Sequence, residues 1–224
     1  MIKRAPYDNL TSLDFLIQQS AKHNRKQAES SISALRDTFL THYLTGEIKM
    51  QSFPPKMSEK ANNKELLNAY ISHHVLQSFR GFIKMLDKLS GDNLEFFKKF
   101  ATKVLGDLAP YAGSEKDMII NTMVNKLGDS DKKVACQTIF VIGNMLNRNP
   151  ELGELVIRSI SILLSRNLKP LARYYAHSCL TKVAQICGKH ESTRLALIKV
   201  YFAQFKQVTG EHTEVDEEDN KVIE

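Results

Sequence analysis

The segment VACQTIFVIGNM (residues 134–145) has two counterparts in the chain, FKKFATKVLGDL (97–108) and ARYYAHSCLTKV (172–183). In all three, a small residue has apolar residues four positions before it, four after it and seven after it. A second matching set lies 22 residues further on, and there an apolar residue is followed four positions later by another. The small residues are Ala101, Thr138 and Ala176; the second set is Met123, Ile160 and Ile198, followed by Leu127, Leu164 and Phe202.

The repeat period is therefore 37 and then 38 residues, with two apolar-faced helices in each unit. Such a period is typical of a HEAT or armadillo α-solenoid, in which a small residue lets paired helices approach and each unit covers the next. We predict an all-α fold with HEAT-like repeats over residues 93–208. A globular helical bundle with a fortuitous spacing is the alternative. Residues 1–92 do not match the period and are predicted to be a helical region, either a degenerate repeat or a cap on the stack.

Apolar residues at spacings of three and four predict helices along most of the chain. A mostly polar stretch with two adjacent prolines, residues 46–63, predicts a loop. Side chains expected in the structural core are Ala101, Thr138, Ala176, Tyr175 and Phe202. The predicted helices cover residues 10–20, 24–44, 64–90, 93–109, 115–127, 131–147, 150–165, 169–188 and 191–207.

The formal net charge of +6 on 224 residues hides an uneven distribution. Residues 211–224 contain seven acidic residues and one lysine, a charge of −6, so that residues 1–210 carry +12. A basic body predicts a polyanionic partner, and the acidic segment 209–224 predicts a disordered tail.

Motifs for catalysis or metal binding are lacking in the sequence. It has no phosphate-binding glycine loop, nucleophile elbow or H-E-x-x-H. The rings of the adjacent His73 and His74 point about 100° apart on a helix, which does not suit a shared metal ion. Cys136, Cys179 and Cys187 form no C-x-x-C pair and are expected to be small core residues in a reducing compartment. We therefore expect no enzyme activity, metal, cofactor or small-molecule substrate.

The N-terminus lacks the apolar stretch of a secretory signal, and the longest apolar windows are too short and too polar to cross a membrane. An intracellular protein without a membrane partner is expected.

Basic residues flank two equivalent turns, LGDSD (127–131) and NLKP (167–170), and predict a basic stripe along one edge of the repeats. Such a stripe could follow the phosphates of RNA without reading its sequence. The alternative is that these side chains only solvate helix ends and complement the helix dipoles, and Asp129 and Asp131 reduce the local charge. The RNA-binding candidates are Lys126, Lys132 and Lys133 at the first turn and Arg166, Lys169 and Arg173 at the second.

Two aromatic groups, Tyr174-Tyr175 and Tyr201-Phe202 with Phe205, lie near basic residues and could stack on single-stranded bases. Their helical spacing beside apolar residues favours packing in the core instead.

Five segments together resemble the CCAAT-binding-factor family of nucleolar complex proteins. The turn NKLGDSDKKVA followed by the A-x-YY-A helix is the most specific part of this resemblance. The segments are ISALRDTFLTHYL (32–44), LEFFKKFATKVLGDL (94–108), MVNKLGDSDKKVA (123–135), LARYYAHSCLTKV (171–183) and IKVYFAQF (198–205).

The resemblance implies a non-enzymatic nucleolar scaffold in the biogenesis of the large ribosomal subunit. Members of the family are helical-repeat proteins that pair with a second nucleolar complex protein and associate with pre-rRNA particles. They usually continue into a second helical block after the YF-x-x-F helix, so this chain is expected to be a reduced member or a fragment.

Two other functions remain open on the sequence alone. A HEAT-like adaptor for protein partners in transport or signalling would need no nucleic acid. A sequence-specific CCAAT-binding factor is less favoured, because the chain has no helix-turn-helix, zinc or basic-zipper element that would read a major groove.

Overall fold

The computed structural model describes residues 9–20, 25–44, 50–52 and 62–209, and within these ranges all regular structure is helical. The prediction of an all-α fold is confirmed. Nine α-helices lie in the described ranges: α1 (Leu10–Ser20), α2 (Arg25–Thr38), α3 (Asn63–Ser90), α4 (Glu95–Leu108), α5 (Lys116–Asn125), α6 (Lys132–Arg148), α7 (Gly153–Leu164), α8 (Pro170–Cys187) and α9 (Glu191–Thr209).

Each described helix matches a predicted one to within a few residues, and the differences are at the ends. A π-helical turn, Phe39–Tyr43, continues α2, and 3₁₀ turns occupy Gly113–Glu115, Lys126–Gly128 and Pro150–Leu152. Most of the predicted loop 46–63 and almost all of the predicted tail 209–224 lie outside the described residues.

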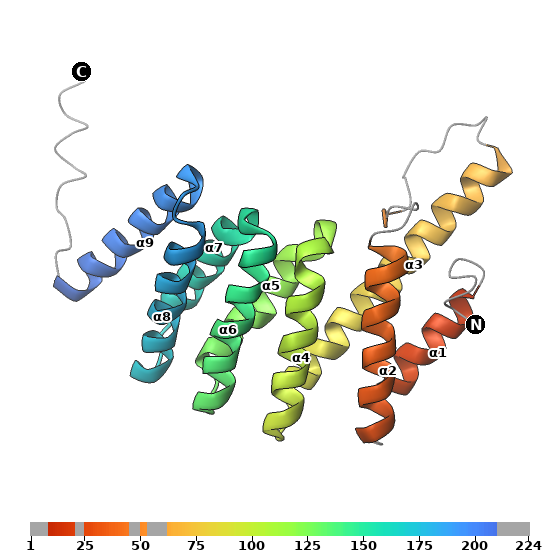
Figure 1. Cartoon of the computed structure of the whole chain (residues 1–224), viewed down its shortest axis with the longest axis horizontal. Helices are drawn as coiled ribbons and strands as arrows, with labels where there is room; N and C mark the ends of the chain where they lie inside the picture. The colour runs from red at the N-terminus through yellow and green to blue at the C-terminus, as the bar shows by residue number, and fades with distance from the viewer. Residues whose placement is uncertain (1–8, 21–24, 45–49, 53–61, 210–224) are drawn as a thin grey trace.

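The helices form two layers (Figure 1). Helices α2, α4, α6 and α8 stand side by side in the front layer, and α3, α5, α7 and α9 cross behind them. Within the front layer α4 packs on α6 and α6 on α8; behind it α5 packs on α7 and α7 on α9. The turns α3–α4, α5–α6 and α7–α8 consequently lie along one edge, the lower one in Figure 1.

Small residues lie at the close contacts of the front layer. Ala101, Thr138 and Ala176 are completely buried. A Cβ atom added to Gly106 of α4 would lie 2.2 Å from Cγ1 of Val141 on α6. Helices α4 and α6 approach so closely at this point that position 106 has no room for a side chain.

Aromatic rings fix α2 against α3. Phe39, in the π-helical turn, lies with its ring centroid 5.0 Å from that of Phe79 and 5.5 Å from that of Phe82. All three side chains are completely buried. The same hydrophobic cluster continues from Leu13 to Val200, so the region before residue 92 and the region after it share one core.

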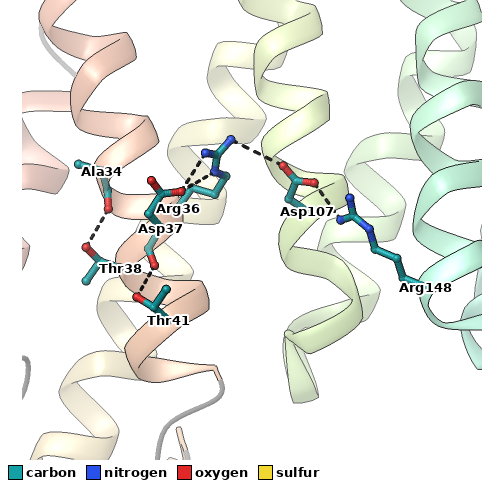
Figure 2. A network of polar contacts seen from close by, with 7 residues as sticks. All are labelled: Ala34, Arg36, Asp37, Thr38, Thr41, Asp107 and Arg148. Atoms are coloured by element: carbon teal, nitrogen blue, oxygen red, sulfur yellow. Dashed lines mark hydrogen bonds and ion pairs between the residues drawn. The ribbon is translucent and has the colours of Figure 1, made fainter. Parts of the chain in front are cut away.

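A shared carboxylate also joins the two regions (Figure 2). Nη1 of Arg148 on α6 lies 3.0 Å from Oδ1 of Asp107 on α4, and Nη1 of Arg36 on α2 lies 3.7 Å from Oδ2. Arg36 also donates to Oδ1 of the neighbouring Asp37, at 2.8 and 3.0 Å. Three helices of the front layer are thus connected through one side chain.

Of the aromatic residues predicted to pack in the core near the two basic groups, only Tyr175 does so. Tyr175 is buried, whereas Phe202, expected in the core, is 64% exposed, and Tyr174, Tyr201 and Phe205 are exposed as well. The prediction of core places for these four is wrong, because helical spacing shows which residues share a face and not whether another helix covers that face.

The cysteine prediction also needs a correction. Cys179 and Cys187 are buried, but Cys136 is exposed on α6. Burial raises the pKa of Cys179 to about 12 and that of Cys187 above its ordinary value. Within the described ranges, no helix combines the length and apolar character that spanning a membrane requires.

We predict that Gly106→Ala lowers the free energy of unfolding by about 1–3 kcal/mol, because the new methyl group overlaps Val141. Gly81→Ala on α3 is the matched control: no atom lies within 4 Å of its added Cβ. Since alanine favours a helix over glycine, this variant should gain up to about 1 kcal/mol. Urea denaturation followed by circular dichroism measures both, and equal shifts in the same direction would contradict the close contact.

We also predict that iodoacetamide at pH 8 modifies Cys136 in the native protein and leaves Cys179 and Cys187 unmodified. The two buried thiols are inaccessible and, because of their raised pKa, protonated at this pH. Peptide mass spectrometry after labelling gives the distribution, and labelling in urea should reach all three residues. Modification of Cys179 in the folded protein would contradict the described packing.

Candidate nucleic-acid interface

The turns α5–α6 and α7–α8 carry the predicted basic residues and lie on the same edge of the two layers (Figure 1). The first turn is held by aspartates: Asp129 Oδ1 accepts the backbone N–H of Asp131 at 2.9 Å, and Asp131 Oδ1 accepts that of Lys133 at 2.8 Å. In the second turn Pro170, whose φ angle suits a helix start, is the first residue of α8.

The surroundings of Lys126 do not favour the RNA-binding role predicted for it. Partial burial lowers the pKa of its ammonium group, and the charges of Asp129 and Asp87 oppose this shift. Lys126 is half-buried and near two carboxylates, so it is less accessible to a phosphate than the exposed Lys132 and Lys133.

Asp129 is also neutralised by α4. Nζ of Lys98 lies 3.0 Å from both of its carboxylate oxygens, and the side chain of Asp129 is only 8% exposed. This bidentate pair, far more buried than an ordinary surface pair, ties the α5–α6 turn to the preceding helix.

Lys132 and Lys133 open α6 and are both exposed. Nζ of Lys133 is 3.7 Å from Glu95 Oε2, a weak contact for a side chain that is 73% exposed. Both lysines can turn towards a ligand, but Asp131 in the turn and Glu95 on α4 reduce the local charge.

Arg166, Lys169 and Arg173 form a more basic group, here named the basic turn. Arg166 and Lys169 are exposed and Arg173 is partly exposed. Residues 165–173 contain no acidic residue, and the three bases form no ion pair within the part of the chain that the structure describes. Arg166 Nη1 lies 3.4 Å from Oδ1 of the neutral Asn125. Positive charge thus increases from the α5–α6 turn to the α7–α8 turn.

Exposed aromatic residues lie on the same helices as the bases: the sequence interpretation considered Tyr174 for base stacking but favoured the core, and it did not consider Phe140 or Phe96. Tyr174 follows Arg173 on α8, Phe140 lies on α6 and Phe96 in the first turn of α4, and all three rings are at least half exposed. Aromatic rings beside bases are the combination that binds single-stranded nucleic acid. Their exposure could have been suspected from the period, because Tyr174 matches Lys99 and Cys136 rather than a core position.

Two histidines of the described residues have identifiable surroundings. His74 Nε2 lies 3.0 Å from Oδ2 of Asp14, a contact between α3 and α1. Burial and the charge of Arg173 lower the pKa of His177. No group of three metal-ligating side chains occurs in residues 9–20, 25–44, 50–52 and 62–209.

Curated proteins of three kingdoms resemble the chain along most of its length. It is 26% identical over 228 aligned residues to CCAAT/enhancer-binding protein zeta of Homo sapiens, covering 89% of this chain and 21% of that protein. It is 23% identical to Ribosome biogenesis protein NOC1 of Chaetomium thermophilum, over 91% of this chain and 22% of that one. It is 28% identical to Protein SLOW WALKER 2 of Arabidopsis thaliana, over 99% and 22% respectively. The chain thus resembles, along most of its length, proteins of the CCAAT-binding and nucleolar complex family.

No family model matches the chain. The chain spans about a fifth of the length of the relatives it matches. The region of resemblance includes both turns of the candidate interface.

We predict that Asp129→Asn costs about 3 kcal/mol of unfolding free energy, because it leaves the charge of Lys98 largely buried and unpaired. Asparagine retains an oxygen for the backbone N–H of Asp131, so that loss of charge is the main change. Lys133→Gln, at an exposed pair, should cost less than about 1 kcal/mol. Urea denaturation at pH 7 compares the two. Adding Lys98→Met to Asp129→Asn should recover part of the loss, and a result in which both single variants cost the same would contradict the role of the buried pair.

Proposed function

We propose that the protein is a non-enzymatic scaffold in the nucleolus that takes part in the biogenesis of the large ribosomal subunit. The names of two relatives support this proposal. The Chaetomium relative is named Ribosome biogenesis protein NOC1, and a Drosophila melanogaster relative that is 22% identical is named Nucleolar complex protein 1. The helical architecture suits a scaffold, because it presents long surfaces to partners.

Residues 93–208 are proposed to be HEAT-like repeats, following a helical region 1–92. Polar contacts at a constant spacing support this proposal. Asp107 pairs with Arg148, Asp117 with Arg158, and Asn125 with Arg166, each 41 residues apart. A recurring separation is expected where each unit stacks on the next in the same register.

The proposed partners are pre-rRNA and a second nucleolar complex protein. The single observation that carries the RNA contact is the basic turn: three accessible bases without an acidic neighbour, next to the exposed Tyr174. Such a group neutralises phosphates and contributes affinity that depends on salt but not on base sequence.

Filter binding of the chain to structured rRNA fragments over a salt series tests this contact. We expect affinity to fall steeply with salt, and Arg166→Glu plus Lys169→Glu to weaken binding by at least about tenfold. Lys132→Glu plus Lys133→Glu should have a smaller effect, because the α5–α6 turn already contains two aspartates.

The matched control is Lys64→Glu plus Lys189→Glu, with the same change of charge at two exposed lysines. These residues lie at the start of α3 and just after α8, away from the basic edge. The control should stay within about twofold of the parent at the same salt concentration. An equal loss in the control, or binding insensitive to salt, would contradict a localised phosphate contact.

An adaptor that binds only protein is the second candidate, favoured by an open groove between α2, α4 and α6. The groove has a volume of about 560 Å³ and is lined by Arg36, Lys103, Asp107, Tyr111 and Arg148, among others. Affinity purification separates the candidates: pre-rRNA and ribosomal proteins support the scaffold, and cargo or regulatory subunits without RNA support the adaptor.

A further inference from the structure

The last described helix, α9, carries an uncovered row of large apolar side chains. Leu195, Ile198, Phe202 and Phe205 follow one another at spacings of three, four and three residues and therefore lie on one face. Each is 51–64% exposed. This row, here named the α9 stripe, runs for about three helical turns. Contiguous exposed apolar surface of this kind marks a site of interaction.

The stripe corresponds to positions that are buried in the two preceding helices of its layer. By the repeat period, Leu195 matches Ile157 and Ile120, Ile198 matches Ile160 and Met123, and Phe202 matches Leu164 and Leu127. All six matching side chains are at most 1% exposed. Helices α5 and α7 pack on the next helix of the layer, α7 and α9 respectively, whereas no described helix follows α9. The uncovered face of α9 is therefore equivalent, by the repeat period, to faces that a neighbouring helix covers.

Charge indicates which kind of helix fits. Residues 192–209 contain Arg194, Lys199 and Lys206 and no acidic residue. A second copy of α9 would bring like charges together, whereas acidic residues beside an apolar face would pair with these bases.

We propose that the α9 stripe docks an amphipathic helix of a partner protein, with large apolar residues at three- and four-residue spacing and with acidic residues beside them. This is recognition of an apolar helix face, and the flanking charges select the partner. The surface lies on a different helix from the basic turn and does not depend on the RNA contact, so either proposal can fail without the other.

A synthetic peptide of about 20 residues serves as the probe, with Leu at the three- and four-residue spacing, Glu beside the Leu row and Ala elsewhere. Its binding to the full chain is measured by fluorescence anisotropy, in parallel with a peptide in which each Glu is replaced by Lys. We expect the Glu peptide to bind at least about tenfold more tightly, with the difference shrinking as salt is added.

Ile198→Asp plus Phe202→Asp should abolish binding of the Glu peptide. Because both side chains are exposed, the variant should keep the circular dichroism spectrum and urea midpoint of the parent. Leu66→Asp plus Tyr70→Asp is the matched control: it places the same charges, four residues apart, on exposed apolar positions of α3. The control should bind as the parent does.

Four results would overturn the proposal. The first is equal affinity for the two peptides, and the second is no binding of the Glu peptide at about 100 μM. The third is binding that appears only after residues 210–224 are deleted, which would assign the stripe to the acidic segment of the chain itself. The fourth is a dimer in sedimentation equilibrium that Ile198→Asp plus Phe202→Asp dissociates, which would assign the stripe to a second copy.

Discussion

Burial of one apolar face of each helix against the next is the constraint on which the whole structure depends. The completely buried positions recur along the layers, from Phe39, Phe79 and Phe82 near the start to Leu180 and Val183 on α8. Each large apolar side chain that is fully buried contributes about 1.5–3 kcal/mol. Exposed ion pairs such as Arg158 with Asp117 contribute about 0–1 kcal/mol each. Apolar burial therefore supplies the stability, and the polar contacts fix the register in which one layer meets the next.

The two turns of the candidate interface contain similar numbers of basic residues, but the surroundings of these residues differ. Lys98 forms an ion pair with Asp129, and Lys126 is partly buried near Asp129 and Asp87. Arg166 and Lys169 lie in solvent without acidic neighbours. One edge thus combines a structural role at one turn with an accessible positive charge at the other, although the two turns read alike in sequence.

Sequence periodicity was sufficient to predict the helices and most of the core. Ala101, Thr138 and Ala176, which a spacing of 37 and 38 residues relates, are buried as predicted. Periodicity could not predict the exposure of Phe202, since a helical pattern is the same whether or not a neighbour covers the face. The pairing of Lys98 with Asp129, 31 residues apart, and the partial burial of Lys126 depend on how the helices pack, which the sequence pattern does not give.

The single carboxylate of Asp107 lies between guanidinium groups of α2 and α6, which come from opposite sides of α4 (Figure 2). The contact of Arg36, at 3.7 Å, and the contact of Arg148, at 3.0 Å, both depend on the position of this carboxylate. A substitution that removes the carboxylate would therefore leave guanidinium groups on two different helices without their acceptor on α4. Asp107 is thus a single position at which the helical region before residue 92 and the helices after it share a polar contact.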